Sequence, residues 1–222
     1  TGHDYDALNR LIRTTDPASG QTRYGYDALD RLTTVTDPRN LVTTYAYNGL
    51  GDLLTLTSPD TGTTRHTYDA AGNLATRRDA KDQLTRYQYD ALNRVARIDY
   101  ADGAAVVHSY DQGANAIGRL TRIEESAGGS VVGRIDYAYD VQGRLSVTTH
   151  TVGGVVSASA YGYSNGRLTR ITYPSGRHVD YTLDALGRIR VVQLTDAGQV
   201  TTLAANIEYR PFGGIRSFTD GA

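Results

Sequence analysis

Tyrosine recurs along this chain at two fixed positions of one repeating phrase, and this repeat constrains the fold more than any other feature. The phrase is Tyr-Asp-x-Leu-x-Arg-Leu, as at residues 5–11 and 26–32. Its first tyrosine, called the anchor below, recurs every 21 residues up to Tyr110 and then at irregular spacing. The anchor positions are Tyr5, Tyr26, Tyr47, Tyr68, Tyr89, Tyr110, Tyr139, Tyr163, Leu183 and Tyr209. A fixed period of this size is typical of a repeat array, in which one structural unit stacks on the next.

Each repeat has the pattern of two strands and two turns. Residues 32–36 are rich in β-branched side chains and are followed by an Asp-Pro turn signal at residues 37–40. Residues 41–47 form a second β-like run, which ends in the Asn-Gly-Leu-Gly of residues 48–51. Helical periodicity is absent. The sequence therefore predicts an all-β fold of antiparallel β-hairpin repeats, each of about 21 residues.

The turn after each anchor has a backbone requirement. Residues that tolerate positive φ stand four positions after the anchor: Asn9, Asp30, Gly51, Gly72, Asn93, Gly143, Gly187 and Gly213. The aspartate that follows most anchors is able to accept backbone amide hydrogen bonds two residues on, which closes the turn. We therefore predict a structural role for the following repeat residues: Tyr5, Asp6, Tyr26, Asp27, Tyr47, Tyr68, Asp69, Tyr89, Asp90, Tyr110, Asp111, Tyr139, Asp140, Tyr163, Asp184 and Tyr209.

A second aromatic residue precedes most anchors by two positions. Because side chains alternate along a strand, this residue shares a face with the anchor, and successive pairs are expected to form a ladder. The position holds Tyr24, Tyr45, Tyr87, Tyr137, Tyr161 and Tyr181, with His3, His66 and His108 as aromatic substitutes. In the other strand, apolar residues such as Leu32 and Val35 are three positions apart. This odd offset predicts that they lie on opposite faces, so that neither face is wholly apolar.

The number of strands predicts curvature. About twenty strands at ~4.8 Å would make a strip roughly 95 Å wide, and strongly twisted open sheets rarely exceed about ten strands without curling. We therefore expect a curved or spiral β-sheet shell. Residues 1–222 are predicted to be a single array, regular over 1–110 and irregular over 111–222. Insertions at residues 112–118 and 125–130 are expected to lengthen two turns as flexible loops, with docking loops as the alternative.

Composition argues against several classes of function. The 23 basic and 24 acidic residues nearly balance and are interspersed, which gives no electrostatic basis for binding nucleic acid or an anionic membrane. No apolar run approaches the roughly 18 residues of a membrane span, and the absence of cysteine excludes disulfides. His150 and His178 lie outside the repeat pattern and lack partners at metal-ligand spacing. We therefore expect no metal, no cofactor and no catalytic residue, and do not expect an enzyme.

The phrases resemble the YD repeats of the Rhs family, which also occur in the B and C components of insecticidal toxin complexes and in teneurins. The resemblance covers essentially the whole chain, because Tyr-Asp, the positive-φ residue, Arg and Leu recur in register; the tail at residues 207–215 also resembles an Rhs variant of the phrase. The resemblance implies a spiral of β-strands that forms a hollow shell, which in bacteria typically encloses a C-terminal toxin. It also implies a self-cleaving aspartate site in a core segment beyond the repeats, and this sequence contains no such core.

Two functions from different classes follow. The first is a structural scaffold, a shell segment that encapsulates a polypeptide toxin, with flanking repeats and a C-terminal cargo as partners and a secreted or cell-surface location. The second is a module that binds carbohydrate or another cell-surface partner through repeated Tyr and Arg side chains. Since the chain has no methionine and starts and stops within repeats, we expect it to be a segment of a longer protein. The strand edges of such a segment would also favour edge-to-edge self-association.

Overall fold

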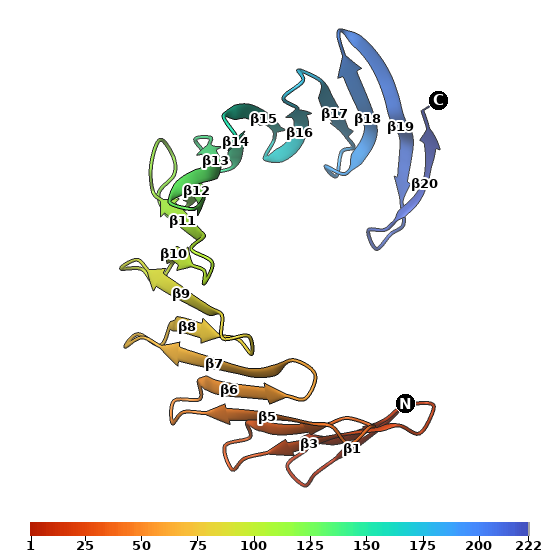
Figure 1. Cartoon of the computed structure of the whole chain (residues 1–222). Helices are drawn as coiled ribbons and strands as arrows, with labels where there is room; N and C mark the ends of the chain where they lie inside the picture. Colours follow the sequence, from red (N-terminus) through yellow and green to blue (C-terminus); the bar gives the residue numbers. More distant parts are fainter. Residues whose placement is uncertain (222) are drawn as a thin grey trace. The chain divides into compact units, whose positions relative to one another are not determined.

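The fold consists of β-strands joined by turns. The computed structural model describes residues 1–221 as twenty strands (Figure 1). Ala222, the last residue of the predicted array, lies outside the described residues. Over the part of the chain described here, no helix is present that could cross a membrane. The predicted all-β fold of antiparallel hairpin repeats is confirmed, and the strands fall into two compact units, Thr1–Ala105 (unit 1) and Val106–Ala222 (unit 2).

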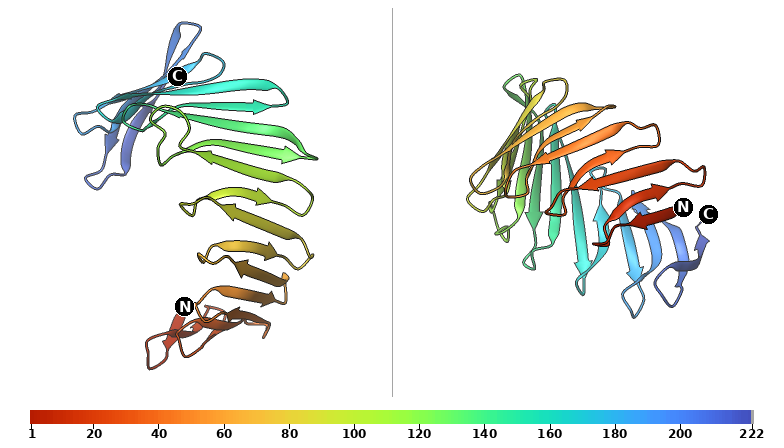
Figure 2. Two further views of the ribbon diagram at one scale, coloured as in Figure 1. Left: turned by 90° about the vertical axis from the view of Figure 1, so that its left-hand side faces the viewer. Right: turned by 90° about the horizontal axis from the view of Figure 1, so that it is seen from below.

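Unit 1 is an antiparallel meander in which each strand pairs with the next one in sequence. Its strands are β1 (Gly2–Tyr5), β2 (Leu11–Thr15), β3 (Gln21–Tyr26), β4 (Leu32–Thr36), β5 (Val42–Tyr47), β6 (Leu53–Ser58), β7 (Gly62–Tyr68), β8 (Leu74–Arg78), β9 (Leu84–Tyr89) and β10 (Val95–Asp99). Within this unit the strands lie side by side in chain order, each rotated relative to the one before it (Figure 2).

Unit 2 continues the same hairpin order with longer strands. β11 (Ala105–Tyr110) starts on the last residue of unit 1. The other strands are β12 (Leu120–Ala127), β13 (Ser130–Tyr139), β14 (Leu145–Val152), β15 (Val155–Ser164), β16 (Arg167–Thr172), β17 (His178–Leu183), β18 (Ile189–Asp196), β19 (Gln199–Tyr209) and β20 (Ile215–Asp220). From β12 to β20 each strand pairs antiparallel with its neighbour in sequence.

A β-bulge beside each anchor changes which residues share a face. Between β3 and β4, Tyr26 lies opposite Leu32 and Tyr24 lies opposite Val35, with a register shift between them. The shift adds one residue to β4, so the odd offset between Leu32 and Val35 becomes an even one in space. These two apolar residues therefore lie on the same face as the tyrosines, and the prediction that they lie on opposite faces was wrong.

The same shift recurs in both units, so one face of each sheet collects the aromatic and aliphatic side chains. Tyr47 lies opposite Leu53 in unit 1, and Tyr163 lies opposite Leu168 in unit 2. In β5 the residues on this face are half-buried, whereas Val42, Thr44 and Ala46 on the other face are exposed. We call these the aromatic face and the polar face.

Threonine dominates the polar face of unit 1. Thr34, Thr44, Thr57 and Thr63 lie opposite one another in a row from β4 to β7. Within residues 1–221 no large side chain is completely buried. Each unit is therefore a single sheet without a second layer, held by its strand ladders and by contacts between neighbouring repeats.

The two insertions have different structures. Residues 112–118 form a loop, as predicted, but the loop is folded against the sheet, because Ala116 is only 1% exposed. Residues 125–130 were expected to be a loop and are instead the extended ends of β12 and β13 around Gly128-Gly129. Both glycines have positive φ, of 57° and 80°, which allows a two-residue turn to join strands that continue up to it.

Candidate functional site

The turn after each anchor is called the anchor loop, and most of these loops close on themselves through an aspartate. In the first loop the Asp6 amide donates to the Arg10 carbonyl, and the Asp6 Oδ1 atom accepts hydrogen bonds from the Leu8 and Arg10 amides at 2.9 and 3.0 Å. The same pair of bonds forms at Asp27, Asp69, Asp90, Asp140 and Asp184. All eight residues predicted to have positive φ four positions after an anchor do have it, from 59° at Asn93 to 97° at Gly213.

An arginine in the anchor loop pairs with the same aspartate. Arg10 Nε donates to Asp6 Oδ2 at 2.7 Å, and equivalent bonds of 2.7–2.8 Å join Arg31, Arg94, Arg144 and Arg188 to their own loop aspartates. The backbone amide of Arg10 lowers the pKa of the Asp6 carboxyl, which its guanidinium lowers further against the opposing effect of burial. These five loops therefore each hold a carboxylate and an oriented guanidinium.

The guanidinium then reaches the next repeat and stacks on its anchor ring. Distances from the guanidinium carbon to the ring centre are 5.0 Å for Arg10 over Tyr26, 5.0 Å for Arg31 over Tyr47, 5.6 Å for Arg119 over Tyr139, 4.3 Å for Arg144 over Tyr163 and 4.7 Å for Arg188 over Tyr209. These separations are within the range of cation–π attraction. Arg31 also donates to the Asn48 carbonyl of the next loop at 2.7 Å.

The anchor hydroxyl returns the contact by donating to the backbone of the preceding repeat. Tyr47 Oη, for example, donates to the Leu32 carbonyl at 2.9 Å. Equivalent bonds of 2.6–3.0 Å join Tyr26 to Leu11, Tyr68 to Leu53, Tyr89 to Leu74, Tyr139 to Leu120, Tyr163 to Leu145 and Tyr209 to Ile189. Burial raises the pKa of Tyr68, Tyr89 and Tyr139, which keeps these hydroxyls protonated as donors. We call this set of contacts between an anchor and the preceding Arg-Leu the seam.

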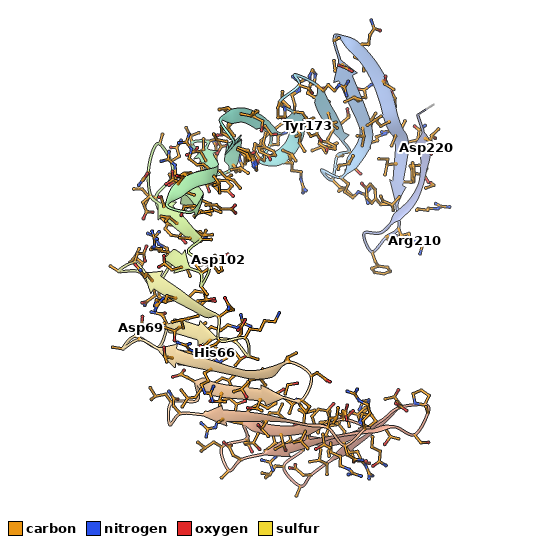
Figure 3. All side chains as sticks on the ribbon, viewed as in Figure 1. His66, Asp69, Asp102, Tyr173, Arg210 and Asp220 are labelled. Carbon is orange, nitrogen blue, oxygen red and sulfur yellow. The ribbon has the colours of Figure 1, made fainter. Side chains whose placement is uncertain are left out.

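The remaining repeat residues have the following positions. Tyr5 is 55% exposed on the first strand, and Tyr110 ends β11. Asp111 opens the long loop and accepts a hydrogen bond from the Gly118 amide at 2.5 Å, in place of an amide two residues on. Asp69, in an anchor loop, and Asp102, in a turn at the other end of the hairpins of unit 1, mark the two rims of that sheet (Figure 3).

The histidines occupy two kinds of position. His66 and His108 stand two residues before an anchor, where each has a buried Nδ1 atom with no hydrogen-bond partner among the described residues. Burial and then the charge of Arg77 lower the pKa of His66, and burial lowers that of His108. His178 Nε2 lies 3.5 Å from Asp180 Oδ2, whereas His150 lines a small cavity of about 110 Å³. Among the residues that the structure describes, no cluster of three or more His, Asp or Glu side chains is arranged to hold a metal.

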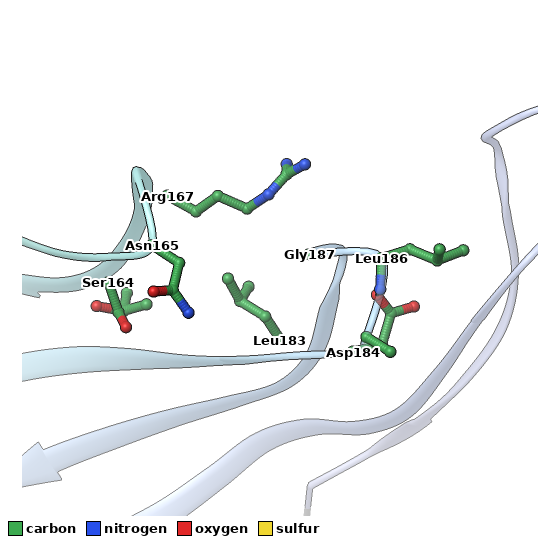
Figure 4. A pocket seen from close by; sticks show the side chains of 9 residues that line it. Ser164, Asn165, Arg167, Leu183, Asp184, Leu186 and Gly187 are labelled. Atoms are coloured by element: carbon green, nitrogen blue, oxygen red, sulfur yellow. The ribbon is translucent and has the colours of Figure 1, made fainter.

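One seam in unit 2 lacks its usual parts. The loop after Tyr163 carries Ser164 where most loops carry aspartate, and the next anchor is Leu183. A pocket of about 430 Å³ opens here (Figure 4). It is lined by Ser164, Asn165, Arg167, Thr169, Leu183, Asp184, Ala185, Leu186 and Gly187. The sequence predictions missed this pocket, although Leu183 had been noted as the anchor position without tyrosine.

Comparison with protein families identifies the repeats. The sequence model described as RHS Repeat matches six overlapping or successive stretches: residues 5–41, 26–64, 47–83, 68–105, 115–156 and 163–202. These stretches include most of the chain. No curated protein matches it.

Solved structures share the fold at low sequence identity. A crystal structure of TcdB2-TccC3-TEV matches 96% of this chain with a TM-score of 0.59 and 13% identity. The Tc holotoxin pore of Photorhabdus luminescens matches 98% of this chain with a TM-score of 0.57 and 14% identity. In both cases the chain covers 15% of the length of the protein that it matches.

Proposed function

Because the chain belongs to the RHS Repeat family, we propose that it is a length of structural wall, and that a longer protein uses this wall to enclose a polypeptide toxin. The observation that carries the proposal is the seam. Most anchors join their repeat to the preceding one through a ring and a hydroxyl, and several also through a guanidinium, in a sheet that has no second layer. Such contacts add repeats in a line and extend a thin surface, which is the property that a container requires.

Two further features support a passive wall. The polar side chains that recur in the repeat already have structural partners, as Asp27 and Arg31 have in each other and in the loop amides. The unrepeated His150 and His178 belong to no metal-binding group within the described residues. We therefore assign no catalytic role to this segment, and we place the longer protein outside the cell that makes it, in keeping with a toxin shell.

One of the similar structures is a Tc holotoxin pore, and this likeness motivates the choice of cargo. TcdB2-TccC3 and the Tc holotoxin pore share the fold with this chain at 13–14% identity. The proposal extends to flanking repeats as neighbours of the chain and to a C-terminal polypeptide as the enclosed partner.

A deletion of whole repeats tests whether the wall of the longer protein encloses the cargo. Removing residues 27–68 deletes two 21-residue periods and leaves the remaining anchors in phase. We expect the cargo to become sensitive to protease and harmful to the producing cell. The control replaces residues 27–68 with a second copy of residues 48–89, which keeps the number of strands. A cargo that stays equally resistant and harmless after the deletion contradicts the containment proposal.

The carbohydrate-binding alternative predicts a different result. A sugar that stacks on the repeated tyrosines would have to displace the arginines that lie over Tyr26, Tyr47 and Tyr163. Tyrosine fluorescence that changes on addition of a glycan, with the change lost in Tyr47→Ala, would favour the binding module over the wall.

A further inference from the structure

Arg167 has lost both partners that the loop arginines have elsewhere. Arg144, in the preceding loop, donates to Asp140 at 2.7 Å and stacks 4.3 Å from the centre of the Tyr163 ring. At Arg167 the first partner is replaced by Ser164 and the second by Leu183. Arg167 is exposed and has no carboxylate or ring partner among the described residues. Two separate substitutions thus remove the two partners of one side chain.

The nearest carboxylate does not replace the missing one. Asp184 lines the pocket, but its carboxylate pairs with Arg188 at 2.8 Å and accepts the amides of Leu186 and Arg188. The pocket therefore has an uncompensated positive charge at Arg167, together with the hydroxyls of Ser164 and Thr169. In Figure 4 Asn165 lies in the turn before β16 and Arg167 begins that strand, whereas Leu183 ends β17 and Asp184 opens the loop after it.

The pocket differs from those at filled seams in its lining more than in its size. A pocket beside Arg188 and its ring partner Tyr209 measures about 390 Å³, close to the 430 Å³ of this one. Here the anchor in the lining is Leu183 in place of a tyrosine, and the lining contains no aromatic ring. The volume is within the range of small-ligand sites. Arg167 and Leu183 thus line the pocket at the positions where a filled seam has a guanidinium and a ring.

We propose that this pocket binds an aromatic ring that carries a nearby carboxylate, so that the ligand supplies from outside the two groups that the repeat lacks. The ring stacks on the Arg167 guanidinium, and the carboxylate pairs with it beside Ser164. The source of this chemistry is either a free aromatic acid or a tyrosine next to an aspartate in a polypeptide. Since the site is open and the ligand small, we expect a dissociation constant on the order of 1–10 mM.

Ligand-observed NMR on the full chain tests this site. The probes are 4-hydroxyphenylacetate for the free acid and capped Tyr-Asp dipeptide for the polypeptide source; preference for one identifies the source. Arg167→Ala should abolish binding without loss of fold, because this side chain is exposed. Arg31→Ala, at a filled seam of unit 1, should leave binding unchanged. The neutral 4-hydroxyphenylacetamide should bind at least about fivefold more weakly, because it lacks the charge that pairs with Arg167.

Leu183→Tyr provides the complementary test. The new ring should fill the pocket, restore the seam and exclude both probes, and it should raise the urea midpoint of unfolding. The proposal is overturned if neither probe binds when its concentration is 10 times the expected dissociation constant. It is also overturned if binding persists in Arg167→Ala. Equal binding of the acid and the amide would likewise overturn it. These outcomes depend on Arg167→Ala and on the probes, so they stand even if the tyrosine variant does not fold.

Discussion

The two units share most features of the anchor loop but differ in most turns at the other end of their hairpins. In unit 1 the far turns at Asp16 and Asp37 repeat the chemistry of the anchor loop: the amides of these aspartates donate to the carbonyls four residues on, and Ser19 and Asn40 have positive φ. In unit 2 two-residue turns with positive φ at both residues occur at Gly128-Gly129, Gly153-Gly154 and Ala197-Gly198, whereas the turn at residues 173–177 keeps the longer form. Strands of 4–7 residues in β1–β10 give way to strands of 6–11 residues in β12–β20.

This difference shows which part of the repeat is constrained by its neighbours. Five anchor loops place an arginine over the ring of the next repeat, and most anchor loops keep the aspartate. The exceptions include the loop after Tyr163, which is a two-residue turn that carries Ser164. The far turn has only to close its own hairpin. A two-residue turn matches the twist of the strands and lets them extend, which explains how unit 2 lengthens its hairpins while keeping its seams.

Removing an anchor ring should have the largest effect. Tyr47→Ala loses the half-buried ring, its stacking on Arg31 and its hydrogen bond to Leu32, and we expect about 2–4 kcal/mol of lost stability. Tyr100 lies in a far turn and is 42% exposed, so Tyr100→Ala should cost less than about 1 kcal/mol. Urea unfolding followed by circular dichroism measures both. Equal losses would mean that the seam is no more constrained than the far turn.

The loss of stability on replacing a glycine by alanine should also differ between the two rims, by less than the loss at the anchor ring. Gly143 and Gly198 both have positive φ, so alanine at either one should cost about 1 kcal/mol. A Cβ atom at Gly143 would also meet the Arg119 guanidinium, which donates to the Gly143 carbonyl at 3.0 Å, whereas Gly198 faces open space. We expect Gly143→Ala to cost about 2 kcal/mol in all, because the charge-assisted bond is disturbed as well. If the two variants had the same denaturation midpoint, this expected difference would be contradicted.

The anchor loops were predictable from sequence because their requirements are local. Only a few residue types tolerate the positive φ at Asn9 or Gly51, and the Asx turn of Asp6 uses amides within four residues. The Gly128-Gly129 pair is typical of a two-residue hairpin turn, and the prediction of a loop at residues 125–130 did not take it into account.

The seam was less predictable because its parts come from different repeats. The Leu32 carbonyl that accepts the Tyr47 hydroxyl is 15 positions away, and the bulge that puts Leu32 and Val35 on one face is a property of two paired strands. Ser164 and Leu183 were visible as departures from the repeat. Their common relation to Arg167 appears only when the seam geometry is known.

Loss of the anchor hydroxyl alone should have a moderate and equal effect in both units. Tyr47→Phe in unit 1 and Tyr163→Phe in unit 2 each remove one bond of 2.9 Å to a backbone carbonyl and keep the ring. We expect about 1 kcal/mol in each case. Differential changes in the urea midpoint provide the measurement. A clearly larger loss in one unit would show that the seams are not equivalent and would weaken the comparison drawn from the turns.

The smallest expected effect is a dependence on pH at the histidines that replace the second aromatic. Burial and Arg77 lower the pKa of His66 in the folded chain, so the unfolded chain binds the proton first as the pH falls below about 6.5. The contribution of neutral His66 to the stability of the fold is therefore full above that pH and is lost as the pH falls towards the folded pKa.

His66→Tyr, which restores the common repeat residue, should reduce the fall in urea midpoint between about pH 7.5 and pH 5.5. His108→Tyr in unit 2 should also reduce it, because burial lowers the pKa of His108. The loop aspartates do not obscure this window, since the pKa values of Asp6 and Asp90 lie below the usual carboxyl value of about 3.9. A pH profile that is unchanged in both variants would show that neither histidine is held neutral by its position in the sheet.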